Sequence, residues 1–268
     1  MHSNHLFRAT IRPSGVLRPT TNYINFAQDL ALNKRILAKH TMASEGQKGG
    51  FILHGIRQLT QGESKYVKPV RMQFTLNGRT RAWDCLKAHD SVASVIYNKS
   101  KNKLIYVKQF RPAVYLSTLT KNMSDLSEFD PTKLQTPVND KVGYTLELCA
   151  GLADKEGMTP QQVMREEIVE ETGYDVPLES VKFICSFRGS TGLSGTLMNL
   201  FFTEVTDEQK LAGGGGVDDE AIEVMELDVE EARKAIYCRD EDAPFSRPPA
   251  MLFGTTWFLY EYLPKLSK

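Results

Sequence analysis

Residues 147–176 read ELCAGLADKEGMTPQQVMREEIVEETGYDV, and the fold is organised around this stretch. β-branched, aromatic and apolar residues between Tyr144 and Cys149 predict a buried strand leading into it. Gly151 and Gly157 then break the pattern into a loop. The stretch therefore begins as the end of a strand followed by a glycine loop.

A helix is predicted to follow the loop. Thr159 is a good N-cap and Pro160 suits the first helical position. Gly173 suits the residue just after a helix, because glycine adopts the left-handed conformation needed there. We therefore expect the helix to end at about Thr172.

Three glutamates occupy one face of this helix, because they are three and four residues apart: Glu167, Glu170 and Glu171. Carboxylates this close repel one another unless a cation lies among them. Mg²⁺ is usually held by a few carboxylates together with substrate phosphate oxygens. The alternative is a solvated acidic face, since most runs of charge lie at the surface. The strand and glycine loop before the helix favour a phosphate and metal site.

The segment EIVEETGY, residues 167–174, preceded by Ala150 and Gly151, resembles the Nudix box. That motif is Gly-x5-Glu-x7-Arg-Glu-U-x-Glu-Glu-x-Gly-U, where U is an aliphatic or aromatic residue. Further segments resemble the uridine diphosphate glucose pyrophosphatases, a Nudix subfamily, and lie within about residues 66–263. These segments are Trp83-Asp84, His89–Val92, Val107–Tyr115, Glu147–Leu152, Phe202–Val205 and Phe253-Gly254.

The chain departs from the motif at three places. The interval from Gly151 to Glu167 is one residue longer than in the pattern. Gly157-Met158 stands where the loop glutamate would be. The arginine position holds Glu166, with Arg165 one step before it.

The resemblance implies an α+β fold, a Nudix-type α/β/α sandwich with a mixed sheet, over residues 89–268. A small antiparallel β-sheet is expected before it, over residues 51–88, where Asn77-Gly78 is a strong signal for a two-residue hairpin turn. By resemblance, this N-terminal sheet is expected to exchange across a homodimer. Residues 1–50 form a basic extension, expected to be disordered or to be a transit peptide.

Other segments are less regular. Residues 51–58 alternate loosely and are interpreted as β structure. Residues 112–143 form a long connection rich in Pro, Ser and Thr, to which we assign no structure.

The glutamates are expected to hold Mg²⁺, with Mn²⁺ as a substitute. Glu167 and Glu171 are the expected side-chain ligands, and Glu170 supports or bridges the metal. The resemblance adds the backbone carbonyl of Ala150 as a ligand. Metal lowers the pKa of a bound water, so the protein base need not be strong.

The general base is expected in the loop of residues 213–220. In related ADP-ribose hydrolases an acidic loop after the box supplies the base. Here four glycines precede an acidic cluster, which suits a loop that closes over bound substrate. Glu220 is the first choice for the base or a metal ligand, Asp218 is the second, and Glu170 is next. A solvated acidic loop is the alternative.

Three residues are expected to contact substrate. Arg111 offers a rigid fork for a phosphate oxygen, the alternative being a surface ion pair. Gly151 lies in the loop before the helix. Trp83 could stack on a uracil, although packing in the core suits a single tryptophan as well.

Bulk properties exclude several classes of protein. Lysines and arginines number 33 and acidic residues 33, so the net charge of zero favours neither nucleic acid nor a membrane surface as a partner. No apolar run reaches the ~20 residues of a membrane helix. The four scattered cysteines are typical of free thiols in a reducing compartment. A cytoplasmic location is expected, or a mitochondrial one if residues 1–50 are a transit peptide.

The leading hypothesis is a Mg²⁺-dependent hydrolase that converts UDP-glucose to UMP and glucose 1-phosphate. Its first alternative is the same chemistry on ADP-ribose or another ADP-sugar. Its second is a nucleotide-sugar binding protein with weak turnover, because the arginine and the loop glutamate of the motif are missing. The presence of all three helix glutamates argues against the second.

Overall fold

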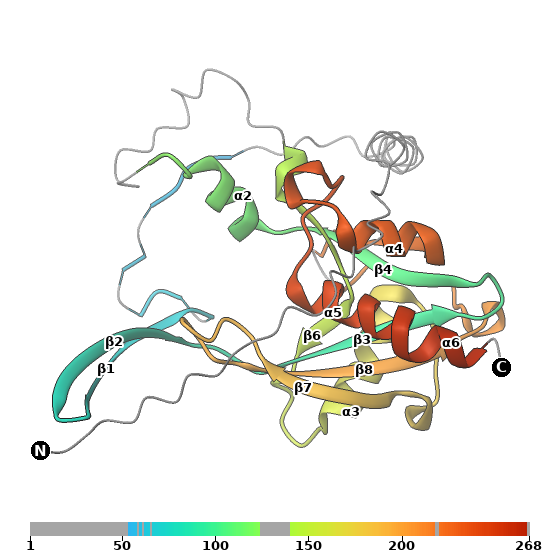
Figure 1. Ribbon diagram of the computed structural model, residues 1–268, viewed down its shortest axis with the longest axis horizontal. Coiled ribbons are helices and arrows are strands. Elements are labelled where there is room, and N and C mark those ends of the chain that lie inside the picture. The colour runs from blue at the N-terminus through green and yellow to red at the C-terminus, as the bar shows by residue number, and fades with distance from the viewer. Residues whose placement is uncertain are drawn as a thin grey trace, which may run out of the picture.

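The computed structural model describes residues 53–57, 59–60, 62–64, 66–123, 140–217 and 220–266. Its main body is a seven-stranded mixed sheet with helices on both faces (Figure 1). The strands are β3 (Ser91–Asn98), β4 (Lys103–Phe110), β5 (Tyr144–Glu147), β6 (Cys149–Leu152), β7 (Lys182–Arg188), β8 (Leu197–Val205) and β9 (Glu223–Asp228). The order is β5-β4-β3-β8-β7, with β6 also paired to β3 and β9 to β4. The predicted α/β/α sandwich is confirmed.

The outer layers are formed by α3 (Pro160–Glu167) on one face and by α4 (Val229–Tyr237), α5 (Pro249–Trp257) and α6 (Leu263–Leu266) on the other. The remaining helix, α2 (Pro112–Leu119), follows β4 and lies beside the turn Asp140–Gly143. π-helical turns extend two of them, α3 through Ile168–Thr172 and α5 through Phe258–Tyr262. Short 3-10 turns lie at Asp140–Gly143, Leu178–Ser180, Asp207–Gln209 and Asp240–Asp242. None of the helices in the described ranges is both long enough and apolar enough to cross a membrane.

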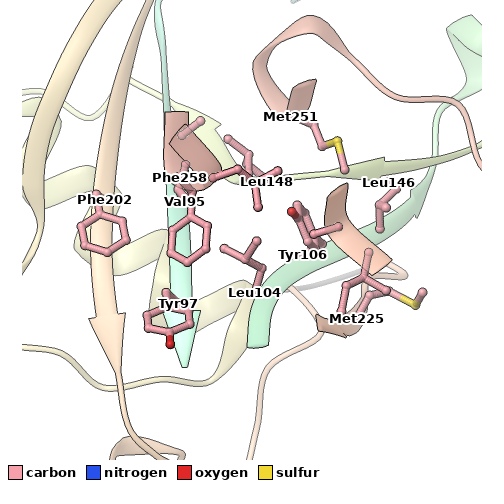
Figure 2. Packing of buried hydrophobic residues seen from close by; sticks show 14 of the residues in the cluster. Val95, Tyr97, Leu104, Tyr106, Leu146, Leu148, Phe202, Met225, Met251 and Phe258 are labelled. Carbon is pink, nitrogen blue, oxygen red and sulfur yellow. The ribbon is translucent and has the colours of Figure 1, made fainter. Parts of the chain in front are cut away.

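Side chains on β3 alternate between two hydrophobic clusters, as expected for a strand buried on both faces. Val95 and Tyr97 face one cluster, which α5 and the turn after it cover with Met251 and Phe258 (Figure 2). Val92 and Ile96 face the other cluster, which α3 covers, chiefly with Met164 and Ile168. The sheet is therefore held from both sides, and α3 is fixed on it by apolar side chains.

The predicted strand over residues 144–149 is broken at Leu148, because the chain changes partners there. β3 and β4 pair only near their connection, from Ile96 opposite Ile105 to Asn98 opposite Lys103. Farther from that connection β4 pairs with β5, and β3 pairs with β6. The single segment 144–152 thus passes from β4 to β3 and carries its polar residues across the middle of the sheet.

The predicted helix boundaries around α3 are confirmed. The Thr159 side chain accepts from the Gln162 amide, and the Gln162 side chain accepts from the Thr159 amide, so the two form a capping box. Gly173 ends the π-helical turn at a φ of 68°. Its left-handed conformation is the one that glycine adopts without strain.

One expectation needs correction, and one segment without an assignment gains a helix. Residues 53–57 form no strand, and the first strand begins only at Lys68. The connection after β4 contains helix α2, for which Pro112 at the first position was a signal in the sequence. The remainder of that connection, residues 124–139, lies outside the described residues, as do residues 1–52.

The predicted N-terminal hairpin is confirmed as β1 (Lys68–Leu76) and β2 (Arg79–Lys87). Asn77 and Gly78 form its turn with φ values of 52° and 71°. The two strands pair only with each other and project away from the sandwich (Figure 1). The Leu86 amide donates to the Leu193 carbonyl at 2.8 Å and joins the base of the hairpin to the loop between β7 and β8.

Candidate active site

Two glutamates of the α3 helix reach across to β6. Glu171 is buried, and its carboxylate accepts from the Ala150 amide at 3.0 Å. Glu167 lies directly over Gly151, where an added Cβ would be only 2.1 Å from the Glu167 Cδ atom. Gly151 is therefore required for this close approach. The structure thus brings together the three residues expected at the metal, Ala150, Glu167 and Glu171, and places Gly151, expected at the substrate, beside them.

The electrostatics of this cluster favour a bound cation. Burial, followed by the nearby charge of Glu170, raises the pKa of Glu167 to about 7. Burial also raises the pKa of Glu171 to about 8, and the charges of Glu167 and Glu220 add to this effect. Ionising these buried, neighbouring carboxyl groups costs free energy in the metal-free protein. A divalent cation would offset their charge and make the ionised forms favourable.

The donor set suits a hard cation that keeps part of its water shell. Across the described ranges, no three His, Cys, Asp or Glu side chains converge as a preformed metal site. The structure provides two carboxylates, and the Ala150 carbonyl, the ligand that the resemblance implies, would complete a smaller set of oxygen donors. Mg²⁺ is commonly bound in this way, with waters and substrate phosphate oxygens as its remaining ligands.

Arg111 is fixed beside the glutamates by a short polar network. Its guanidinium donates through Nε and Nη2 to the two Glu147 carboxylate oxygens, each at 2.7 Å. The Thr145 hydroxyl donates to the same carboxylate at 2.5 Å. This hydrogen bonding raises the pKa of Arg111, and the charges of Glu171 and Glu220 raise it further. The guanidinium is thus an oriented cation near the glutamates of the helix.

The glycine run before the acidic loop is packed against the end of the α3 helix, and its closure over substrate stays a prediction. The amides of Gly215 and Gly216 donate to the carbonyls of Glu171 and Glu170 at 2.8 and 3.1 Å. Glu220 is exposed at the end of this segment, and its charge contributes to the raised pKa of Glu167 and Glu171. Asp218, the second choice for the base, lies outside the described residues.

Trp83 lies apart from this cluster on the N-terminal hairpin. Its side chain is 54% exposed, so core packing is excluded, and its Nε1 donates to the Gly192 carbonyl at 3.0 Å. The stacking of Trp83 on a substrate base stays a prediction.

The departures from the motif have structural counterparts. Glu166, at the arginine position, accepts from the Lys155 ammonium at 2.6 Å, and that ammonium is 4.0 Å from Glu170. Arg165 pairs with Asp175 and does not take the missing role. The cation beside these glutamates is Lys155, which the sequence analysis did not name. A lysine in the longer loop before an acidic helix was a usable signal for it.

Cys149 and Thr145 were also missed as parts of the site. Cys149 is fully buried, and burial beside the Glu171 charge raises the pKa of its thiol well above the usual range. The hydroxyl of Thr145 supports Glu147. No local pattern marks either residue, because their roles depend on contacts across the sheet.

Comparisons with known proteins agree with this architecture. The chain is 34% identical over 210 residues to the uridine diphosphate glucose pyrophosphatase NUDT14 of Bos taurus. It is 30% identical to the protein of that name from Mus musculus, and each alignment covers 76% of this chain and 93% of the relative. A GDP-mannose pyrophosphatase of Klebsiella pneumoniae is 33% identical over 142 residues, which are 53% of this chain and 59% of that protein. No protein-family model matches.

The mixed-sheet sandwich with a glutamate helix over a glycine loop, taken together with the relatives, makes this protein a hydrolase. The relatives then settle the narrower assignment. The chain belongs to the Nudix hydrolase family.

The contact between Gly151 and Glu167 can be tested directly. Gly151→Ala is expected to displace Glu167 and to lower kcat/KM by about 10²-fold, the size of effect that a 1 Å misplacement produces. Gly189→Ala is the control, because a Cβ there meets nothing nearer than 3.8 Å. Steady-state rates of the two variants at equal thermal stability make the comparison. Equal rates would show that the position of Glu167 is unimportant.

Proposed function

We propose that this protein hydrolyses the diphosphate bridge of UDP-sugars, converting UDP-glucose and water to UMP and glucose 1-phosphate. Mg²⁺ is the cofactor, and Mn²⁺ is a substitute. The observation that carries the proposal is the pair Glu167 and Glu171, which meet Ala150 and Gly151 at the end of the central sheet. The relatives named above supply the class of substrate.

Each residue has a defined task in this reaction. Glu167, Glu171 and the Ala150 carbonyl hold the metal, which when bound neutralises phosphate charge and lowers the pKa of a water. Arg111 contacts the phosphate through the edge of its guanidinium that faces away from Glu147, because Glu147 already binds the Nε and Nη2 edge and restricts its rotation. Glu220 accepts a proton from the attacking water.

A panel of substrates tests which nucleobase and which sugar the enzyme prefers. UDP-glucose, UDP-galactose, GDP-mannose and ADP-ribose are compared at saturating Mg²⁺ by following nucleoside monophosphate release. GDP-mannose is the second candidate, because pyrophosphatases of that name align with half of this chain. The highest kcat/KM is expected for UDP-glucose. Comparable kcat/KM values for ADP-ribose or GDP-mannose would overturn the assignment of uracil as the preferred nucleobase.

The same assay separates an enzyme from a binding protein. A nucleotide-sugar binding protein would bind UDP-glucose in calorimetry with no Mg²⁺-dependent release of UMP. Burial raises the pKa of Glu171, and carboxyl groups with strongly raised pKa values cluster at functional sites, which supports a catalytic role.

We also propose that the N-terminal hairpin mediates a homodimer. One face of this two-stranded sheet carries four exposed apolar residues, Val70, Met72, Leu76 and Trp83, and near its turn also carries Arg79 and Arg81. The opposite face carries the ion pair of Arg71 and Asp84. An apolar face of a two-stranded sheet needs a partner, because such a sheet is marginal alone.

Met72→Glu is therefore expected to give a monomer in size-exclusion chromatography with light scattering. Gln73→Glu, on the other face of the same strand, is the matched control and is expected to leave the dimer unchanged. A monomeric wild-type protein would refute the proposal.

A further inference from the structure

Residues 210–216 satisfy the carbonyl groups at the end of the glutamate helix. A helix leaves its last four carbonyls without partners inside the helix. Here the Val169 carbonyl accepts from the Gly173 amide, and the next four carbonyls, those of residues 170–173, all accept from this one segment. The donors are the amides of Gly216, Gly215 and Leu211 to Glu170, Glu171 and Gly173, and the Lys210 ammonium to Thr172. The three amide contacts measure 3.1, 2.8 and 2.8 Å.

Lys210 contributes more than one contact at this point. Its ammonium also lies 5.0 Å from the centre of the Tyr174 ring, and Tyr174 is buried. A cation at a helix C-terminus is favoured by the helix dipole. Lys210 is therefore held between the end of the helix and the buried ring.

The segment lies so close to the helix that one of its residues has no room for a side chain. At Gly214 an added Cβ would be 2.9 Å from the Thr172 carbonyl carbon and 3.0 Å from the Gly173 nitrogen. Both obstacles are backbone atoms, which cannot rotate away. At Gly213 an added Cβ meets nothing within 4 Å. The two glycines both have positive φ, 97° and 153°, so they differ chiefly in this close contact.

The helix end and the acidic loop are thereby joined. Glu170 and Glu171 lie in the turn whose carbonyls the segment binds. Beyond the glycines, the Glu220 carboxylate accepts from the Val217 amide at 3.3 Å, and the Glu220 amide donates to the Val217 carbonyl at 3.1 Å. A few short contacts, most of them between backbone atoms, thus fix the position of Glu220 relative to Glu171.

We infer that Lys210 and Gly214 are positioning residues, which fix the segment 210–216 on the helix end and so set Glu171 and Glu220 at the separation that the metal and the attacking water require. The inference rests on the proposed function. It assigns the glycine run to close backbone packing. Neither residue touches the substrate.

Gly214→Ala is compared with Gly213→Ala. Each variant is examined by calorimetric Mg²⁺ titration without substrate, by kcat and KM for UDP-glucose, and by thermal unfolding. Gly214→Ala is expected to weaken Mg²⁺ binding and to lower kcat by about tenfold or more, with KM changed by less than about twofold. Gly213→Ala shares the strain of a positive φ but not the clash with the helix backbone, so its effects are expected to be clearly smaller. Equal effects of the two substitutions would overturn the role of Gly214.

Lys210→Met keeps the inference testable if Gly214→Ala does not fold. It removes the charge but preserves the length of the side chain, and Lys182→Met on the exposed face of β7 is its control. Lys210→Met is expected to weaken Mg²⁺ binding and to lower kcat while KM holds. Unchanged Mg²⁺ binding and kcat in Lys210→Met would overturn the inference.

The metal titration also separates this inference from the proposed function. It needs no turnover, so the two variants and their controls can be compared even if no nucleotide sugar is hydrolysed. Mg²⁺ binding by the wild type with no hydrolysis of any substrate refutes the function alone. Hydrolysis with equal Mg²⁺ affinity and equal kcat in all the variants refutes the positioning role alone.

Discussion

Glu171→Gln is expected to lose nearly all UDP-sugar hydrolysis while the protein stays folded. A bound metal contributes several kcal/mol to the transition state, and each tenfold in rate is about 1.4 kcal/mol, so a loss of at least about 10³-fold in kcat is expected. Glutamine has nearly the same volume, and its carbonyl can still accept from the Ala150 amide. The kcat of the purified variant at saturating Mg²⁺ is the measurement.

The same substitution is expected to leave the metal-free protein as stable as wild type or more stable. The pKa of Glu171 is raised from 4.5 to about 8, so the folded state binds the proton more tightly than the unfolded state does. Ionisation of Glu171 therefore destabilises the wild type as pH rises from about 4.5 to 8. The advantage of the Glu171→Gln variant in thermal unfolding should grow over that range and should shrink when Mg²⁺ is added.

Glu166→Gln is the matched control on the same helix, because Glu166 faces Lys155 and does not reach Ala150. It is expected to retain activity within a few-fold of wild type. If Glu171→Gln also retained such activity, Glu171 could not be a metal ligand.

Glu220→Gln is expected to lower kcat strongly with little change in KM. Loss of a general base typically costs about 10²–10⁴-fold. The effect falls on kcat, because the proton transfer belongs to the transition state and not to substrate binding. Measuring kcat and KM across a range of Mg²⁺ concentrations separates two roles. A metal ligand would show a loss that shrinks at high Mg²⁺, and a base would not.

Two comparisons complete this test. Glu230→Gln on α4 changes an exposed carboxylate, 68% accessible, and is expected to have no effect. Asp218→Asn examines the second candidate. If only Asp218→Asn lowered kcat, Asp218 would be the base and the order of preference would be wrong. If neither did, Glu170 and Glu147 would be the next residues to change.

The sequence predicted the elements whose boundaries are set by residues within one turn of the chain. The capping residues Thr159 and Pro160, together with Gly173, define α3 and its end, because caps act within one turn. Asn77-Gly78 defines the first hairpin for the same reason. The short helix α2 was missed because it has neither acidic residues in its first turn nor basic residues in its last.

Contacts across the sheet were not predictable in this way. The Arg111 fork was expected, but its partner Glu147 lies 36 residues away and follows only from the pairing of β4 with β5. The glycines at 213–216 were interpreted as a hinge, because a glycine run has few conformational restraints. The same lack of a Cβ also permits close backbone packing, and composition does not distinguish the two uses.

The hydrogen bond from the Ala150 amide to Glu171 offers a spectroscopic readout of the site. This amide is on the strand, while its acceptor is an expected metal ligand. Its ¹H–¹⁵N resonance should therefore shift when the carboxylate binds a cation or a proton, without substrate and without any label on the ligand. An NMR titration that follows this one resonance would report metal occupancy independently of catalysis.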